Sequence, residues 1–183
     1  MPERGSRPPG PAELDDDFLY YLRIGSELVH QGRADEGRVA LERALALRPD
    51  HTKALNLLAL AYFKLGFLDR ARQIYSALAE AYPHEPALFV NLGLVLLREA
   101  RLDDAERALR TALMMAPDHT RAHCYLGMVL YRRGELVQAR EHFIRGDAVE
   151  FARRLEARIA EGRASWSTIR KIAEDGVQTL STD

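Results

Sequence analysis

A repeat of about 34 residues runs through most of this chain and constrains its fold more than any other feature. Pro49, Pro83 and Pro117 are evenly spaced by one such period, and a shared pattern of apolar and small residues precedes each of them. The copy that ends at Pro83 contains the pattern Leu55, Leu58, Ala59, Tyr62, Ala71 and Tyr75. An internal repeat of this length is typical of a stacked array of similar units rather than of one compact fold.

Each copy of the repeat is expected to form two helices. In the second copy, residues 55–62 and 71–78 each place their apolar side chains on one helical face. Gly66 lies between these segments, where the end of a helix favours a left-handed residue. Gly32 and Gly134 occupy the same column, but the third copy has Ala100, so we expect that turn to be strained or closed differently. The second helix ends at the proline, which has no amide hydrogen, and Pro86 suits the first turn of the next helix.

Small residues recur where the two helices of a pair must approach closely. The first helix carries Gly25, Ala59, Gly93 or Gly127, and the second helix carries Ala71, Ala105 or Ala139 at the facing column. A larger side chain at these columns would force the helices apart. Gly37 fills the facing column in the first copy and costs about 1 kcal/mol of helix propensity relative to alanine.

These columns resemble the signature of the tetratricopeptide repeat (TPR) family, W-x2-L-G-x2-Y followed by A-x3-F and P. The resemblance covers about residues 18–150, and its main departures are His123 in the large apolar column and Phe151 in place of a fourth proline. It implies an all-α, right-handed solenoid whose first helices line a concave groove. The four expected helix pairs span about residues 18–50, 52–84, 86–118 and 120–146. Weaker resemblances are to the TPR segments of bacterial multidomain proteins and to the TPR chaperones of type III secretion.

The segments outside the repeats differ from one another. Residues 1–14 are expected to be disordered, and the acids Asp15, Asp16 and Asp17 predict a helix that starts near residue 17. Residues 147–161 form an amphipathic pattern that predicts a helix capping the array. Gly162 should end it. Residues 162–183 predict a last helix that folds back as a second cap, dimerises or joins a further domain, with an apolar stripe of Trp166, Ile169, Ile172, Ala173 and Val177.

The composition restricts the partners and the compartment. The net charge is −1, so no bulk field draws the chain to nucleic acid or to a membrane surface. The single cysteine excludes an internal disulfide, so the fold needs no oxidising compartment. The N-terminal residues lack the apolar run of a signal peptide, and no apolar stretch approaches the roughly 18 residues that span a bilayer. We therefore expect a cytoplasmic protein without a nucleic-acid partner or membrane insertion.

Few residues suggest a catalytic or metal-binding site. His119 and His123 are four residues apart, with Cys124 adjacent, and this spacing can place two imidazoles on one metal. However, His119 belongs to a turn, His123 occupies a core column and Cys124 is expected to face the groove, so the three should not converge. No phosphate-binding loop or nucleophile motif is present. We therefore expect no catalytic residue, no metal, no cofactor and no enzymatic activity.

The groove is the better candidate for function. It has a basic or titratable column that recurs once per repeat and an apolar floor, and it carries no acid. The predicted partner-binding residues are Arg23, His30, Lys53, Asn56, Leu60, Phe63, Lys64, Asn91, Leu94, Leu97, Arg98, Arg121, Tyr125, Met128, Tyr131 and Arg132. They predict a partner segment with apolar side chains and acidic flanks. The alternative is that the floor is shielded by superhelical curvature or by a terminal segment.

The sequence therefore predicts an adaptor or scaffold that binds a peptide segment of another protein. Two alternatives stay open: a chaperone for an aggregation-prone client, and a self-assembly module that forms a homo-oligomer. Some TPR proteins similar to this one bind chaperone C-termini through a carboxylate clamp. Asn91 and Arg121 match parts of the clamp, but Asn56, Leu60 and Tyr125 stand where its remaining residues are expected. The clamp is incomplete and is not predicted.

Overall fold

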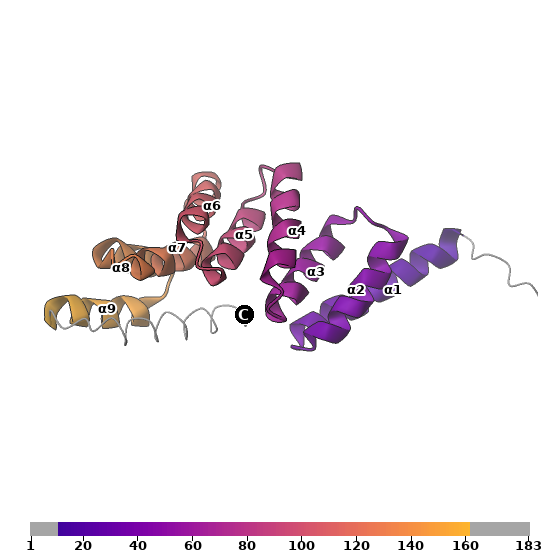
Figure 1. Ribbon diagram of the computed structural model, residues 1–183, viewed down its shortest axis with the longest axis horizontal. Coiled ribbons are helices and arrows are strands. Elements are labelled where there is room, and N and C mark those ends of the chain that lie inside the picture. The colour runs from indigo at the N-terminus through magenta and orange to yellow at the C-terminus, as the bar shows by residue number, and fades with distance from the viewer. Residues whose placement is uncertain (1–10, 162–183) are drawn as a thin grey trace, which may run out of the picture. The chain divides into compact units, whose positions relative to one another are not determined.

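The computed structural model describes residues 11–161 of the chain as helices joined by short turns, without a strand in this range (Figure 1). The helices are α1 (Pro11–His30), α2 (Ala34–Leu47), α3 (Thr52–Lys64), α4 (Leu68–Ala81), α5 (Pro86–Arg98), α6 (Leu102–Met115), α7 (Thr120–Arg132), α8 (Leu136–Arg145) and α9 (Val149–Glu161). The predicted all-α repeat architecture is confirmed. Within the described range, no helix is both long and apolar enough to cross a membrane.

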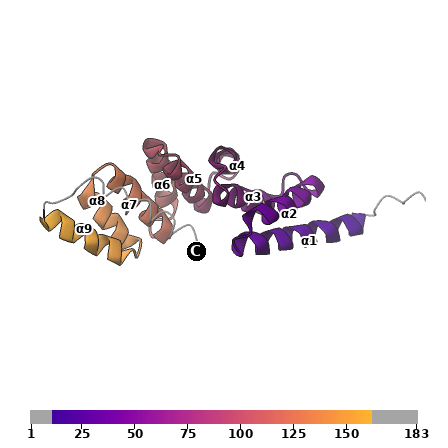
Figure 2. The same ribbon diagram turned by 60° about the horizontal axis from the view of Figure 1, so that its bottom comes forward.

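The helices fall into two units, Met1–Ile74 and Tyr75–Asp183, which divide inside α4. In the first unit, α2 packs against both α1 and α3, and α1 also contacts α3. Its core includes Phe18, Val29, Leu41 and Ala44. Both views show α1 and α2 lying side by side (Figures 1 and 2). The first unit thus presents the first helices of two successive repeats next to each other.

The second unit repeats this arrangement and extends it. The helix α6 packs against α5 and α7, α8 packs against α7 and α9, and α5 contacts α7 directly. The helix α9 buries Ala152 and Leu155, and its Phe151 ring stacks on that of Phe143 with centroids 5.7 Å apart. Figure 2 shows α9 lying alongside α8. This helix therefore covers α8, as expected of a cap. Between the two helices the chain turns through Asp147 at φ 57°.

The small residues lie where the helices of a pair touch. A Cβ placed on Gly93 would lie 2.6 Å from Leu109 Cγ, and one on Gly127 would lie 2.9 Å from the Phe143 ring. The close approach predicted at this column is present. The prediction for Gly37 needs correction, because a Cβ there would lie 2.6 Å from Val29 Cγ2. Gly37 is therefore required by the contact between α1 and α2, and does not merely replace an alanine.

The turn inside each repeat closes in the same way in all four copies. The backbone N–H of the residue after the column of Gly66 bonds back to the first helix, as in Arg101 N to Leu96 O at 2.9 Å and Arg33 N to Leu28 O at 2.9 Å. Gly66 has φ +82°, and Ala100, which occupies the same column, has φ 59°. The third turn therefore keeps the shared geometry, and its alanine adopts the left-handed conformation at a cost of roughly 1 kcal/mol.

The first helix begins earlier than predicted. It starts at Pro11 instead of near residue 17, and a proline suits the first turn of a helix. Asp15 then lies within α1, where it pairs with Arg48 at the end of α2, whose guanidinium also lies over the Phe18 ring. Asp15 thus joins two helices and does not mark a helix start. The predictions for residues 1–10 and for the helix in residues 162–183 lie outside the described residues.

Candidate functional site

The predicted partner-binding residues of the first unit lie on α1 and α3, and most of them are exposed or half-buried. We call the side on which they lie the concave side, after the groove expected from the repeat pattern. Lys53, Asn56, Leu60 and Lys64 are spaced by three or four residues, so they form one stripe along α3. Lys53 and Lys64 are exposed, and Asn56 and Leu60 are half-buried. This stripe, which we call the α3 stripe, offers one apolar and one amide side chain between two cations.

The neighbouring helix α1 contributes Arg23 and His30, whose side chains already have partners within α1. Arg23 is exposed, but it pairs with Glu27 at 3.0 Å, so part of its charge is neutralised locally. The His30 ring lies 2.7 Å from the carbonyl oxygen of Ser26 in its own helix. Of the predicted first-unit residues, only Phe63 is fully withdrawn from the surface, with 3% of it exposed. We therefore assign Phe63 to the core, which corrects its predicted place in the groove.

The basic column has a structural role that the sequence pattern did not reveal. Lys64 Nζ donates to the carbonyl oxygen of Val29 at 3.2 Å, and Arg132 Nη1 donates to that of Leu97 at 2.7 Å. Val29 and Leu97 are the next-to-last residues of α1 and α5, and each carbonyl also accepts a backbone N–H of the following turn, at 3.2 Å and 3.1 Å respectively. A cation there also interacts favourably with the helix dipole. The recurrence of this column once per repeat therefore reflects, at least in these two places, how one repeat closes the end of the previous one.

The apolar floor of the second unit is buried. Leu94 and Met128 occupy the column of Leu60, but only 7% and 2% of them are exposed. Leu97, Tyr125 and Tyr131 are buried as well. The open floor expected from the sequence is therefore not found on α5 and α7, because these side chains are buried. The predicted residues that reach its surface are Arg98 and Arg121, which are exposed, and Asn91 and Arg132, which are half-buried.

Two buried phenols lie near the exposed Arg121. Burial raises the pKa of Tyr75, and the positive charge of Arg121 partly offsets this effect. Burial likewise raises the pKa of Tyr125, against the same opposing charge. Both rings are therefore neutral hydrogen-bonding groups at physiological pH, and neither of them neutralises the charge of Arg121.

The residues considered for a metal serve three separate structural purposes. His119 caps α7, since its Nδ1 accepts from Ala122 N at 3.4 Å. Cys124 is buried and donates from Sγ to the carbonyl oxygen of Gly146 at 2.8 Å. It therefore does not face the groove, which corrects the prediction. Burial also raises its pKa to about 11, so its thiol is a poor nucleophile. In the described part of the chain no group of three potential ligands could hold a metal ion.

His123 has a partner that the sequence reasoning missed. Its Nε2 lies 2.7 Å from the carbonyl oxygen of Pro117, and its Nδ1 lies 2.8 Å from His142 Nδ1. Because a carbonyl only accepts, His123 carries its proton on Nε2, and His142 must then donate from its own Nδ1. Burial lowers the pKa of His142 to about 4, assisted by His123, Arg110 and Arg145 and opposed by Glu141. A signal for this pair existed, because both residues replace apolar side chains at facing core columns of one repeat.

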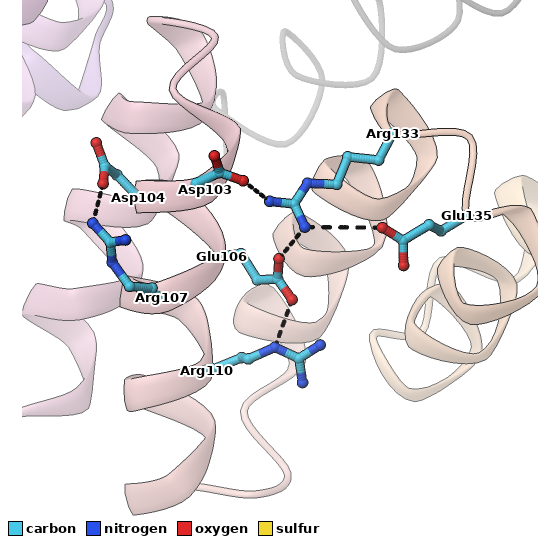
Figure 3. A network of polar contacts seen from close by, with 7 residues as sticks. All are labelled: Asp103, Asp104, Glu106, Arg107, Arg110, Arg133 and Glu135. Atoms are coloured by element: carbon cyan, nitrogen blue, oxygen red, sulfur yellow. Dashed lines mark hydrogen bonds and ion pairs between the residues drawn. The ribbon is translucent and has the colours of Figure 1, made fainter.

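A dense charged cluster joins α6 to the turn after α7. Arg133 contacts Asp103 and Glu106 of α6, and its Nη1 lies 3.8 Å from Glu135 (Figure 3). Arg110 also pairs with Glu106 at 2.7 Å. The acids of this cluster are thus paired with arginines. We therefore interpret the cluster as an ion-pair network that links successive repeats, and not as a catalytic or metal site.

Comparison with known proteins places this architecture in a family. A family model described as a tetratricopeptide repeat matches residues 22–86 and 90–148. A TPR repeat-containing protein of Pseudomonas aeruginosa, PA4667, is 37% identical over 82 residues, which are 43% of this chain. This chain spans only 14% of the length of that curated relative.

Solved structures agree with this assignment. TTC0263, a thermophilic TPR protein of Thermus thermophilus, has a TM-score of 0.67 and 25% identity, over 80% of this chain and 84% of its own. MamA from the strain AMB-1 has a TM-score of 0.59 and 27% identity, over 76% of this chain and 80% of its own. MamA of Desulfovibrio magneticus RS-1, at 22% identity and a TM-score of 0.67, covers 77% of this chain and 80% of its own and shares the fold. The chain belongs to the tetratricopeptide repeat family.

Proposed function

We propose that this protein is a non-enzymatic adaptor or scaffold that binds a segment of a partner protein on the concave side of its first unit. Tetratricopeptide repeats generally mediate protein–protein interactions, and their superhelices present extended concave surfaces for this purpose. The α3 stripe carries the proposal, because it keeps Lys53 and Lys64 exposed around the half-buried Asn56 and Leu60.

The stripe defines the chemistry of the partner segment. Leu60 offers an apolar contact, and the Asn56 amide has both donors and an acceptor for a peptide backbone. Lys53 supplies a positive charge, and Lys64 retains further donors because one of its three N–H groups suffices for the Val29 carbonyl. We therefore propose a segment with an apolar side chain next to acidic residues. Its association should be steered by charge and weakened by salt.

The proposal is tested by capturing a partner with the full chain and measuring its affinity for charge-reversed variants. Lys53→Glu and Leu60→Ser should each weaken binding about tenfold or more, since a tenfold change corresponds to about 1.4 kcal/mol. Arg154→Glu on α9 is the matched control, because it makes the same charge change at another exposed cation. Unchanged affinity in both α3 variants would show that the concave side of the first unit is not the binding surface.

Two further observations distinguish this proposal from a chaperone and from a self-assembly module. A client that stays soluble only while bound would favour a chaperone, and concentration-dependent mass of the isolated protein would favour self-assembly. A cytoplasmic location is part of the proposal, because the fold rests on no disulfide and the one cysteine, Cys124, is a free buried thiol.

A further inference from the structure

The first helix exposes two large apolar side chains at columns that differ from those of the later repeats. Tyr20 is 53% exposed and Leu19 is 57% exposed. In α3 and α7 the column of Tyr20 holds Ala54 and Ala122, which are fully buried. A large apolar side chain at the surface of an end helix is a candidate contact for another molecule.

The exposed side of α1 lies directly opposite its buried side. The buried side is formed by Phe18, Leu22, Gly25 and Val29. The residues two positions earlier in the chain are all exposed, and they are Asp16, Tyr20, Arg23 and Glu27. Because an α-helix has 3.6 residues per turn, two positions correspond to a rotation of about 200°. One continuous stripe of α1 therefore faces away from the core of the first unit.

Tyr20 is already held in place on this stripe. Its ring meets that of Tyr21 edge-on, with the centroids 5.4 Å apart. The Arg43 guanidinium of α2 lies 5.5 Å from the centroid of the Tyr21 ring. An aromatic side chain that is ordered beforehand loses little conformational entropy on association, which suits it to anchor an interface.

The charges of the stripe are arranged symmetrically about its apolar centre. Asp16 lies three residues before Leu19, and Arg23 lies three residues after Tyr20. In an antiparallel pair of α1 helices with the twofold axis between positions 19 and 20, Leu19 would face Tyr20 of the second copy. Asp16 would face the second copy's Arg23, and the reverse pair would form at the other end. A twofold interface requires this kind of self-complementarity.

We propose that this face of α1, formed by Asp16, Leu19, Tyr20 and Arg23, binds a second copy of the chain as an antiparallel helix pair. Arg23 also pairs with Glu27 at 3.0 Å, but a guanidinium has five N–H donors and can bind a second carboxylate. The contact uses α1, so each copy keeps its α3 stripe. The dimer thus presents two partner-binding sites, and a partner with two suitable segments gains avidity.

The dimer is expected to be weak, because one helix from each copy makes a small interface. A dissociation constant on the order of 10–100 µM is in the range of such contacts. Sedimentation equilibrium of the full chain from a few micromolar to several hundred micromolar should therefore show a transition from monomer to dimer. A parent protein that stays monomeric throughout would overturn the proposal and leave this face of α1 to another partner.

The apolar contact is tested by Tyr20→Ser, which should weaken dimerisation about tenfold or more. Met114→Ser is the matched control, because Met114 is a 77% exposed apolar residue of α6, and it should leave the dimer unchanged. Lys53→Glu, which tests partner binding, should also leave it unchanged. Self-association that Lys53→Glu abolishes and Tyr20→Ser does not would assign it to the α3 stripe and overturn the proposal.

The antiparallel register is tested by mixing two charge-reversed variants. Asp16→Arg alone and Arg23→Asp alone each place like charges opposite one another twice, so each should dimerise about tenfold more weakly than the parent. In the mixture, Arg at position 16 meets Asp at position 23 and the native Arg23 meets the native Asp16, so a heterodimer should form with nearly the parent affinity. Circular dichroism confirms that each variant is folded. A mixture that associates no better than the separate variants would overturn this pairing.

Discussion

The two units carry the same columns and use them differently. On α3, Leu60 and Asn56 lie half-open between two exposed lysines, whereas Leu94 and Met128, at the column of Leu60 in α5 and α7, are buried. The residues that build the helix pairs hardly differ between the units, because Gly25 and Gly93 both lie against a leucine of the facing helix. The repeating columns therefore fix the scaffold, and the columns between them decide whether its concave side is open.

The strongest destabilisation is expected at the close contact between α5 and α6, and its extent shows whether the two units unfold independently. Gly93→Leu would place a side chain where even a Cβ lies 2.6 Å from Leu109, so we expect it to lower the free energy of unfolding by about 3 kcal/mol or more. Hydrogen exchange should show amides of α5–α8 losing protection while those of α1–α3 keep it. Gly25→Leu is the reciprocal variant in the first unit. Equal loss of protection throughout in both variants would show that the array unfolds as one body.

A pH-dependent loss of stability is expected only in the second unit, because it contains the His123–His142 pair, in which His123 is buried and His142 is half-buried. The pKa of His142 is about 4 in the folded state, below its ordinary value of 6.5. Between these values the unfolded state binds more protons, so stability is complete above about pH 6.5 and falls as the pH decreases toward 4. We expect a loss on the order of 1–3 kcal/mol for this partly buried group. Denaturant titrations from pH 7 to 4.5 measure it.

The control for the pH effect is His142→Phe, which restores an apolar side chain at a core column. This variant should flatten the stability profile over the same pH range, and hydrogen exchange of the first unit should change little in either protein. An unchanged slope in the variant would show that other groups, and not this pair, cause the loss.

The helix pairs and their turns could be predicted because each depends on neighbours in the sequence. Pro83 ends a helix, Gly66 closes a turn, and Gly93 meets Leu109 within one repeat. The burial of Leu97 and the role of Arg132 depend instead on contacts between successive repeats. A single helical wheel treats each helix as isolated, so it assigns such side chains to a groove.

The basic column allows a direct comparison between repeats of the two units. Arg132 bonds to its carbonyl at 2.7 Å and is half-buried, whereas Lys64 bonds at 3.2 Å and is exposed. Arg132→Met should therefore lower stability by about 1–2 kcal/mol, and Lys64→Met by about 0.5 kcal/mol. Urea denaturation measures both. If both variants left the free energy of unfolding unchanged, the capping role would be contradicted. Partner binding would then be the one role left for this column.

The mildest changes in stability are expected at the turn inside a repeat, where Ala100 and Gly66 occupy the same column. Ala100 holds φ 59° in the second unit, where Gly66 holds φ +82° at the same column of the first. Ala100→Gly relieves this strain but makes the unfolded chain more flexible, so we expect a net gain of about 0.5–1 kcal/mol. Gly66→Ala should cost about 1 kcal/mol, and no atom outside its immediate neighbours lies within 4 Å of the added Cβ. Thermal melts of the two variants should therefore show stability changes of opposite sign. Because neither substitution changes the charge, this result would identify backbone conformation as the cause. If both variants lose stability, the left-handed turn tolerates alanine in the third repeat for a reason that lies outside the turn.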